Sequence, residues 1–455
     1  MSTTQNHPAN SLPSAGLDHN PQPTPQPPRI RHGRRNLTFG IALSAILLLI
    51  VTLSGSAASY FLLNKAPTVT PTPTISANGP FVTLPLSQSA IYQIQHLPEE
   101  MQAQELARIY VSHMTLSQKL GQLFMVQALT QNNSANTPDT MYMLNQLHAG
   151  GIIMYAIQMN TLKQTKGDIQ AMQLNASIPL LVSTDEEGGL VERVQNIFGN
   201  RPGALETYQT GKVSNAIKLG NGIAHDLQEL GINTDLAPDM DVLQVKNSSS
   251  YMDTRTWGYT PDSVITYGGA YLRTVQGDNE IACLKHFPGL GAAKTDAHTS
   301  LPIINSSKEK IYATDLAPYK YFLSSSNSLD MPGMIMTTDL LMPALDPQLP
   351  AELSPTIING ILRAQLHYNG VVITDALWMD GISKKWDLVQ ASIMALLAGD
   401  DMLLGNIGKD QMIMIINGLK NALQDGQLSM SRINEAVTRI ITLKFQYHLL
   451  RAPWY

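Results

Sequence analysis

The run Val371-Val-Ile-Thr374, followed at once by Asp375, is the stretch of the 455-residue chain that decides the fold. It is short, β-type and mostly apolar, which is typical of a strand buried on both faces. Strands of this kind belong to parallel sheets that are covered by helices. Asp375 therefore marks the end of a buried strand.

Seven other runs of the same kind occur along the chain, which makes eight. Amphipathic segments lie between most of them, including 214–230, 354–366 and 388–398. Eight alternating units of strand and helix predict a single (β/α)8 TIM-type barrel. The other seven runs are Leu123–Val126, Gly151–Tyr155, Pro179–Ser183, Thr234–Ala237, Ile281–Leu284, Met334–Thr337 and Asp401–Leu404.

Polar groups follow four of the eight runs. Asp185, the pair Lys285-His286, Asp339 and Asp375 each come just after a predicted strand. Active sites of such barrels lie at the carboxyl ends of the strands, so we expect these groups to converge on one mouth. A polar residue after a strand often does no more than start a turn, but four on one rim favour a site.

The stretch Lys285-His-Phe-Pro-Gly-Leu-Gly291, continuing through Thr295-Asp-Ala-His-Thr-Ser-Leu-Pro302, carries the most chemistry. Lys285 and His286 supply hydrogen-bond donors at the end of a strand. The two glycines predict a flexible loop that carries Asp296 and His298. A carboxylate two residues from a histidine can accept a hydrogen bond from its ring and raise its basicity, as general acid–base catalysis requires.

This stretch resembles the signature of family 3 glycoside hydrolases, in their β-N-acetylglucosaminidase branch. Other segments resemble the family in the same order along the chain, over about residues 98–450. These segments are Asp185-Glu-Glu-Gly-Gly-Leu-Val-Glu-Arg193, Arg255-Thr-Trp-Gly258, Gly370-Val-Val-Ile-Thr-Asp-Ala-Leu377 and Gly399-Asp-Asp-Met-Leu-Leu404.

The resemblance implies an exo-acting, retaining β-N-acetylhexosaminidase that cleaves terminal β-linked N-acetylglucosamine from peptidoglycan fragments or related amino sugars, without a cofactor or metal. Asp375 would be the nucleophile that forms a covalent glycosyl-enzyme. His298 would be the general acid/base, polarised by Asp296. The residues implied to bind the sugar are Asp185, Arg193, Arg255, Lys285 and His286.

The sequence departs from the family pattern at three positions. Leu290 stands where histidine is usual, Ala292 where aspartate is usual, and Ala297 where serine is usual. The first two are expected to change loop closure or the aglycone site, and none removes a bond-making group. Simpler interpretations remain for other residues: an Asp185–Arg193 ion pair, a surface role for Arg255, a buried thiol for Cys283, and either a core or a sugar-platform role for Trp378.

The first 96 residues predict delivery to a membrane. Residues 1–36 are proline-rich and end with four arginines, so we expect a disordered cytoplasmic tail. No charged residue occurs at the 29 positions between Arg35 and Lys65, which is long enough for a transmembrane signal-anchor helix over 37–63. The arginines before it place the catalytic domain, 97–455, outside the cell membrane. A Thr/Pro-rich stalk is expected over 64–96, and a cleaved signal peptide is the alternative to the anchor.

Composition excludes several other classes of protein. The chain is 44% hydrophobic with a net charge of −5 and a pI near 6.1, so nucleic acid is not an expected partner. One cysteine allows neither an internal disulfide nor a zinc–thiolate cluster. His286, His298 and Asp375 could ligate zinc, but no His-Glu-x-x-His spacing occurs, so a metal hydrolase is not favoured. The expected partner is a carbohydrate, and the catalytic domain is expected to be monomeric.

Three alternatives to the hexosaminidase remain. Family 3 β-glucosidases usually draw their acid from a second domain, and no such domain is expected after the last predicted helix, 431–447. A phosphorylase variant stays open, because a histidine acid repels phosphate less than a carboxylate does. A membrane-tethered sugar sensor without turnover is motivated by the altered loop around Leu290.

Overall fold

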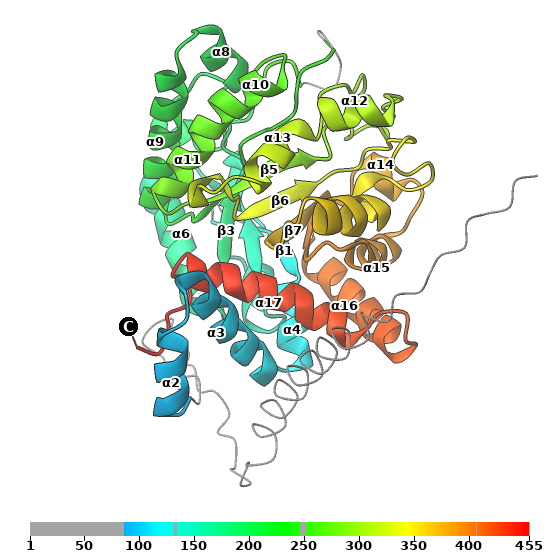
Figure 1. The fold of residues 1–455 in the computed structure, drawn as a ribbon. Helices are drawn as coiled ribbons and strands as arrows, with labels where there is room; N and C mark the ends of the chain where they lie inside the picture. The colour runs from blue at the N-terminus through cyan, green and yellow to red at the C-terminus, as the bar shows by residue number, and fades with distance from the viewer. Residues whose placement is uncertain (1–85, 132–133, 246–251, 406, 455) are drawn as a thin grey trace, which may run out of the picture. The chain divides into compact units, whose positions relative to one another are not determined.

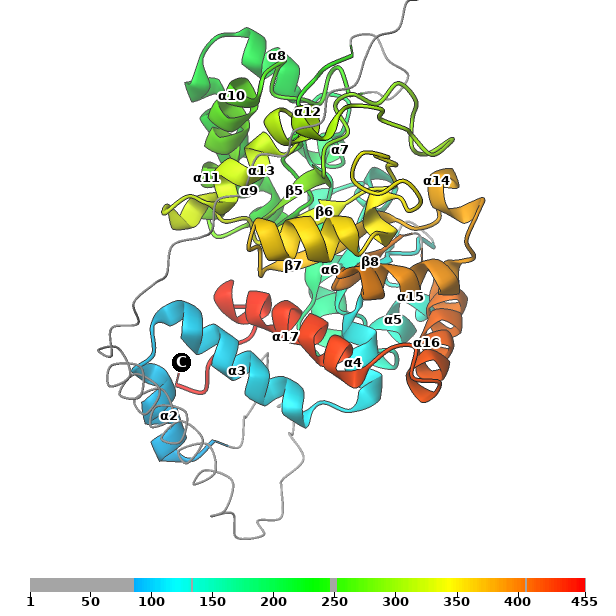
Figure 2. The same cartoon turned by 45° about the vertical axis from the view of Figure 1, so that its right-hand side comes forward.

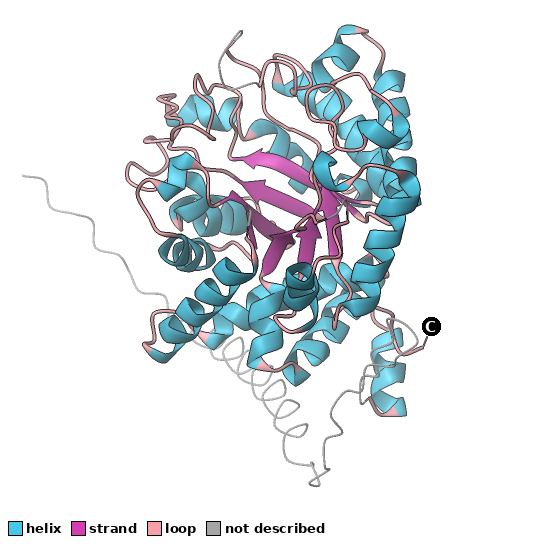
Figure 3. Ribbon diagram, turned by 180° about the vertical axis from the view of Figure 1, so that it is seen from behind, coloured by secondary structure: helices cyan, strands magenta, loops and turns pink. Residues whose placement is uncertain are grey.

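The computed structural model describes residues 86–131, 134–245, 252–405 and 407–454. Within these residues, eight parallel strands form one closed barrel in chain order, and β8 pairs with β1. Helices surround the strands, as Figure 3 shows from behind. The predicted (β/α)8 barrel is confirmed. Its strands are β1 (Phe124–Gln127), β2 (Gly151–Ile153), β3 (Leu181–Thr184), β4 (Thr234–Asp235), β5 (Ile281–Phe287), β6 (Met334–Thr337), β7 (Val371–Ala376) and β8 (Met402–Leu404).

Two strands extend further than the apolar pattern predicts. β5 continues through Lys285 and His286 to Phe287, which pairs with Thr337 of β6 after an irregularity in register. β7 continues through Asp375 to Ala376. The apolar runs end earlier because side chains at the mouth of the barrel face a polar cavity while their backbone stays in the sheet. These polar residues are therefore held by strands and not by loops.

The outer layer consists mainly of helices that follow the strands (Figure 1). Three predicted amphipathic segments form α9, the π-type helix η5 (Thr356–Gln365) and α15. The α-helices are α2 (Gln88–Gln95), α3 (Glu99–His113), α4 (Leu116–Gln122), α5 (Pro138–Asn145), α6 (Leu162–Asn175), α7 (Gln195–Phe198), α8 (Ala204–Gln209), α9 (Val213–Leu230), α10 (Pro261–Ser263), α11 (Gly269–Gly277), α12 (Lys308–Ala313), α13 (Ala317–Leu323), α14 (Asp380–Ser383), α15 (Leu388–Ala398), α16 (Lys409–Gln424) and α17 (Met430–Gln446). The remaining elements are the π-type helix η2 (Val264–Gly268) and the 3₁₀ turns η1 (Ala156–Gln158), η3 (Ser328–Asp330) and η4 (Ala351–Leu353).

Helices from the two ends of the described chain pack together. α3 lies against α17, and both views in Figures 1 and 2 show them side by side. α2 occupies the end of the predicted stalk, and its first turn is capped by the Ser87 side chain. The tail 1–36 and the anchor 37–63 lie outside the described residues. No helix in the described part of the chain is long and apolar enough to cross a membrane.

The amino end of the barrel is held by a buried carboxylate with three arginine partners. Asp401, just before β8, lies 2.7 Å from Arg363, 2.9 Å from Arg432 and 3.1 Å from Arg439 in nitrogen–oxygen distance. Arg363 comes from η5 and the other two from α17. Burial alone would raise the pKa of Asp401, but the three guanidinium groups hold that pKa below its usual range. The three arginines thus connect the start of the last strand to η5 and α17.

A second buried charge site at this end gives a prediction about pH and stability. Lys444 is fully buried, and its Nζ donates to Gln122 Oε1 at 2.7 Å and to the Gly150 carbonyl at 2.8 Å. Burial lowers the pKa of Lys444 to about 7. An unfolded lysine has a pKa of about 10.4, so between these values the unfolded chain holds a proton that the folded chain lacks. The contribution of Lys444 to the free energy of unfolding therefore rises from pH 7 towards pH 10.

We expect Lys444→Met to remove that rise. Urea unfolding of the parent and the variant at pH 7, 8 and 9 measures the difference in their free energies of unfolding. This difference should shift in favour of the parent by up to about 1.4 kcal/mol per pH unit. Parallel stability profiles for the two proteins would contradict the assignment.

Candidate active site

A cavity of about 450 Å³ opens at the carboxyl end of the barrel. Residues at or just beyond the ends of seven strands line it, from Gln127 of β1 to Leu404 of β8. The structure brings all eight residues that the sequence analysis predicts for the site into this one lining. They are Asp185, Arg193, Arg255, Lys285, His286, Asp296, His298 and Asp375.

Asp339 does not join them, and its predicted place at the mouth is wrong. Its side chain is fully buried and is absent from the lining of the cavity. The chain after β7 covers it, because a Cβ on Gly381 would lie 2.1 Å from Asp339 Oδ2. Burial raises the pKa of Asp339 well above its usual range, and the negative charge of Asp375 raises it further. Asp339 therefore lies beneath the site as a buried side chain and does not offer its carboxyl group to the cavity.

Asp375, near the end of β7, offers a carboxylate to the cavity. Its Oδ2 accepts a hydrogen bond from Thr338 Oγ1 at 3.1 Å. Its Oδ1 accepts from the backbone N–H of Ala376 at 2.7 Å. Each oxygen is thereby held by one donor, which orients the group without surrounding it. This arrangement suits a carboxylate that must attack a carbon atom of the substrate.

The Asp296–His298 dyad lies in the segment between β5 and α12. Asp296 Oδ1 is 2.7 Å from His298 Nδ1 and also accepts from the His298 backbone N–H at 2.9 Å. The His298 side chain is 62% exposed, whereas that of Asp296 is 20% exposed. With Nδ1 engaged by the carboxylate, Nε2 is the ring nitrogen that can exchange a proton with a substrate. The Trp378 ring lies 6.2 Å from the imidazole, centroid to centroid.

Paired charges form the floor of the cavity. Lys285 Nζ lies 2.8 Å from Asp185 and 2.6 Å from Glu187. Glu187 in turn receives two hydrogen bonds from Arg255, at 2.8 and 2.9 Å. Burial alone would raise the pKa of Glu187, but Arg255 and Lys285 hold that pKa well below its usual range. The floor therefore holds both negatively and positively charged side chains in fixed positions, where they can bind polar groups of a ligand.

Two simpler interpretations from the sequence do not hold. Asp185 pairs with Lys285, and among the described residues Arg193 forms no ion pair; its guanidinium lies 5.8 Å from the Tyr155 ring. Arg255 is not a surface residue, since its side chain is 15% exposed and bound to Glu187. Cys283 is a buried thiol, as expected.

Glu187 is buried beneath the floor, where it pairs with Lys285 and Arg255, and the sequence analysis did not single it out. It is the third residue of the Asp185-Glu-Glu-Gly-Gly motif, so the signal was present in the motif itself. The chain turns sharply after it, and Gly188 and Gly189 both adopt positive φ, of 80° and 64°. A Cβ on Gly188 would lie 2.4 Å from the Pro202 carbonyl oxygen, so the turn requires glycine there.

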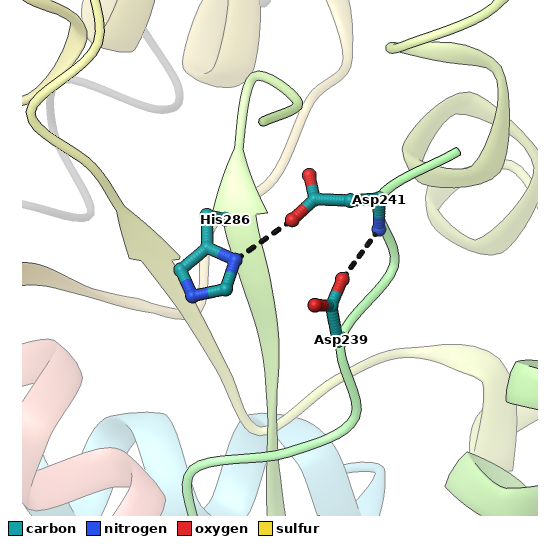
Figure 4. Close-up of side chains that lie close together, drawn as sticks. All are labelled: Asp239, Asp241 and His286. Atoms are coloured by element: carbon teal, nitrogen blue, oxygen red, sulfur yellow. Dashed lines mark hydrogen bonds and ion pairs between the residues drawn. The ribbon is translucent and has the colours of Figure 1, made fainter. Parts of the chain in front are cut away.

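A second cluster that the sequence analysis missed lies behind His286 (Figure 4). Asp241 Oδ2 is 2.7 Å from His286 Nδ1, and Asp239 Oδ1 accepts from the Asp241 backbone N–H at 2.8 Å. Arg255 Nη2 lies 3.2 Å from His286 Nε2. Burial lowers the pKa of His286 to about 4, so the ring is neutral at pH 7. It then donates from Nδ1 to Asp241 and accepts from Arg255 at Nε2.

The same cluster offers three possible metal ligands. One atom from each of Asp239, Asp241 and His286 lies within 4.8 Å of the others. Arg255 already brings a positive charge to it, with Nε 4.0 Å from Asp239 Oδ2 and Nη2 directed at the imidazole. A cation would have to displace the His286–Asp241 hydrogen bond and tolerate that guanidinium. We therefore interpret the cluster as a hydrogen-bonded support for His286.

The loop that carries Asp296 and His298 is hydrogen-bonded at its start, whereas its glycines led us to expect a flexible loop. Asp241 Oδ1 accepts from the Leu290 backbone N–H, and the Gln244 N–H donates to the Gly291 carbonyl at 2.9 Å. A Cβ on Gly291 would lie 2.0 Å from the Val242 carbonyl oxygen. Glycine at position 291 therefore allows this backbone to approach that of Val242 closely.

The unusual residues of this loop are accommodated by apolar packing. Leu290 is 6% exposed, packs into the main core and contributes to the lining of the cavity. Ala297 forms a small buried cluster with Ala376 and Met379. Ala376 directly follows Asp375 in the chain. A hydroxyl group at position 297 would need a partner in that apolar cluster, which alanine does not. The loop thus packs on the end of β7, which carries the carboxylate.

Asp241 is predicted to position both His286 and the loop that carries Asp296 and His298. Its carboxylate accepts from two donors, His286 Nδ1 and the Leu290 N–H, whereas an asparagine amide offers one acceptor oxygen. We expect Asp241→Asn to reduce kcat/KM about 10- to 100-fold, mainly through KM if His286 holds the sugar. Steady-state kinetics together with ¹⁵N chemical shifts of the His286 ring measure this. An unchanged ring signal and an unchanged KM would contradict the prediction.

The fold and the site together define a (β/α)8-barrel enzyme, with its reactive groups at the carboxyl ends of the strands. Residues 115–443 match the N-terminal domain of glycosyl hydrolase family 3. The chain belongs to this family.

Several relatives and solved structures are named as β-hexosaminidases or β-N-acetylglucosaminidases. It is 30% identical over 335 residues to β-hexosaminidase A of Pseudoalteromonas piscicida, covering 68% of this chain and 55% of that protein. It is 30% identical to β-hexosaminidase LpqI of Mycobacterium tuberculosis, covering 72% and 82% respectively. The structure of a family 3 β-N-acetylglucosaminidase from Paenibacillus superposes with a TM-score of 0.69 at 30% identity, covering 74% of this chain and 64% of the other. The chain thus spans little more than half of the first relative.

Proposed function

We propose that this barrel is a retaining β-N-acetylhexosaminidase that hydrolyses terminal β-linked N-acetylglucosaminides. The observation that carries the proposal is that Asp375 and the Asp296–His298 dyad line the same cavity. Attack by the carboxylate at the anomeric carbon, with proton donation from the histidine to the leaving oxygen, gives a glycosyl-enzyme. Water, deprotonated by the histidine, then releases the sugar with retained configuration.

The floor of the cavity supports recognition of the cleaved sugar. Asp185, Lys285, Glu187 and Arg255 form a buried chain of ion pairs whose remaining donors and acceptors can bind hydroxyl groups. Charges held in place before the substrate arrives stabilise an oxocarbenium-like transition state with little reorganisation. The N-acetyl specificity is proposed from similarity to proteins named as β-N-acetylglucosaminidases, and β-hexosaminidases recur among the relatives.

The decisive experiment compares two aryl glycosides on the full-length protein. Release of 4-nitrophenol from the β-N-acetylglucosaminide should be fast, and release from the matching β-glucoside should be slow. A preference for the glucoside would support a β-glucosidase, and a rate that depends on added phosphate would support a phosphorylase. No release from folded protein that still binds N-acetylglucosamine would support a sugar sensor.

We also propose that residues 37–63 anchor the barrel at the outer face of the cell membrane. The support is the sequence alone: 29 uncharged positions preceded by four arginines. Carbonate-washed membranes should retain the full-length chain, and protease added to intact cells should remove the barrel. Recovery of the chain in the soluble fraction would contradict the anchor.

A further inference from the structure

Three large apolar side chains stand exposed at the cavity of the barrel. Ile157 is 68% exposed, Leu190 is 59% exposed and Trp378 is 42% exposed. They follow β2, β3 and β7, and all three contribute to the lining of the same cavity. We call Ile157, Leu190 and Trp378 the apolar rim. Large apolar side chains that are exposed together around a pocket are typical of a binding surface.

The backbone beneath the rim is held in place, so the exposure of these side chains is built into the fold. Ile157 sits on η1, where the buried Gln158 side chain accepts from the Tyr155 N–H at 2.6 Å and donates to the Ala128 carbonyl at 3.0 Å. Leu190 sits in a turn that is closed by the Glu187 N–H donating to the Val191 carbonyl at 2.9 Å. Both side chains are therefore presented to solvent by fixed turns.

The rim and the floor of the cavity differ in chemistry. The floor carries Asp185, Arg255, Lys285 and His286, which are charged or hydrogen-bonding groups suited to a sugar ring. The two aliphatic members of the rim offer no donor or acceptor to a hydroxyl group. The cavity thus has one polar zone and one apolar zone, which favours a substrate with the same division.

The position of the catalytic dyad shows which part of the substrate meets the rim. His298 delivers its proton to the oxygen of the leaving group, so the group on that oxygen lies beside His298. Trp378 is the neighbour of His298, with ring centroids 6.2 Å apart. The leaving group therefore contacts Trp378, and an apolar chain on it that extends across the same cavity reaches Ile157 and Leu190.

From this geometry we infer that the preferred substrate is an amphiphilic N-acetylglucosaminide whose leaving group carries an alkyl or aryl portion. The inference rests on the proposed function and adds the chemical class of the leaving group. The apolar portion gains free energy by leaving water on contact with Ile157, Leu190 and Trp378. A purely carbohydrate leaving group would gain little from the two aliphatic side chains.

The test uses methyl, butyl and hexyl β-N-acetylglucosaminides with the full-length protein. These alcohols are similar as leaving groups, so differences in kcat/KM report contacts with the alkyl chain. We expect kcat/KM for the hexyl glycoside to exceed that for the methyl glycoside by about tenfold. The double variant Ile157→Ser/Leu190→Ser should reduce this ratio to about two, because the hexyl chain loses its apolar contacts. Leu174→Ser is the matched control, because Leu174 is 73% exposed on α6 and does not line the cavity.

Three outcomes would overturn the inference: a hexyl-to-methyl ratio near one in the parent, a ratio that the double variant leaves unchanged, or a higher kcat/KM for the β-1,4-linked N-acetylglucosamine disaccharide than for the hexyl glycoside. Calorimetric binding to Asp375→Asn keeps the inference testable if no glycoside turns over. In that case the hydrolase proposal has failed. Tighter binding of the hexyl than of the methyl glycoside would still support the role of the apolar rim in binding an alkyl group. Equal binding of the two would overturn the rim as well.

Discussion

Substitution of Asp375 by glycine is expected to reduce kcat for an aryl β-N-acetylglucosaminide by about 10⁴-fold or more. Asp375 is the carboxylate at the end of β7 whose two oxygens are each held by a single donor. Without it no glycosyl-enzyme can form, and the rest of the cavity supplies only binding and proton transfer. Steady-state release of 4-nitrophenol measures the loss, and circular dichroism checks the fold.

Chemical rescue makes this prediction specific to a nucleophile. Sodium formate added to Asp375→Gly should occupy the vacated space and restore part of the rate, because a small carboxylate replaces the one that was removed. Product configuration followed by NMR should show retention in the parent. Asp425→Gly is the control, since Asp425 is exposed at the end of α16. Activity of Asp375→Gly within tenfold of the parent would refute the assignment.

Substitution of His298 by alanine should have an effect that depends on the leaving group. The methyl glycoside has a poor leaving group that needs a proton, so we expect a loss of about 10²- to 10⁴-fold in kcat/KM. A 2,4-dinitrophenyl glycoside needs no protonation, so its kcat/KM should fall less than about tenfold. The second step still requires a base, so the glycosyl-enzyme should accumulate. Stopped-flow absorbance should then show a burst of dinitrophenolate equal to the amount of enzyme.

The chain offers a matched control for this prediction. His225 on α9 also lies beside an aspartate, Asp226, at 3.0 Å, and its side chain is 75% exposed. His225→Ala should leave both substrates unaffected, because the residue does not line the cavity. Equal losses for the two substrates in His298→Ala would show that the histidine does not act as the acid.

The sequence was most informative where function depends on local pattern. The eight apolar runs predict the eight strands, because burial on both faces of a parallel sheet selects apolar residues over short lengths. Residues next to these runs, such as Asp185, Lys285 and Asp375, reach the mouth of the barrel because parallel strands end together. The same rule was wrong for Asp339. The rule contains no information about which segment packs over the end of a strand.

The pairings within the site could not be predicted, because they join residues far apart in the chain. Glu187 meets Arg255 68 positions away, and Asp241 meets His286 45 positions away. No spacing rule connects such residues. The role of Gly291 was also missed, since a glycine that permits close packing against Val242 looks in sequence like a glycine that permits motion.

The sequence by itself thus determined the barrel and the residues that end its strands, because hydrophobic periodicity and strand length are local properties. Closure of the barrel decided which of those residues pair with one another, which become buried and neutral, and which stand exposed around the cavity. Those properties depend on distances and on access to water, which exist only once β8 has paired with β1 and the loops have packed over the strand ends.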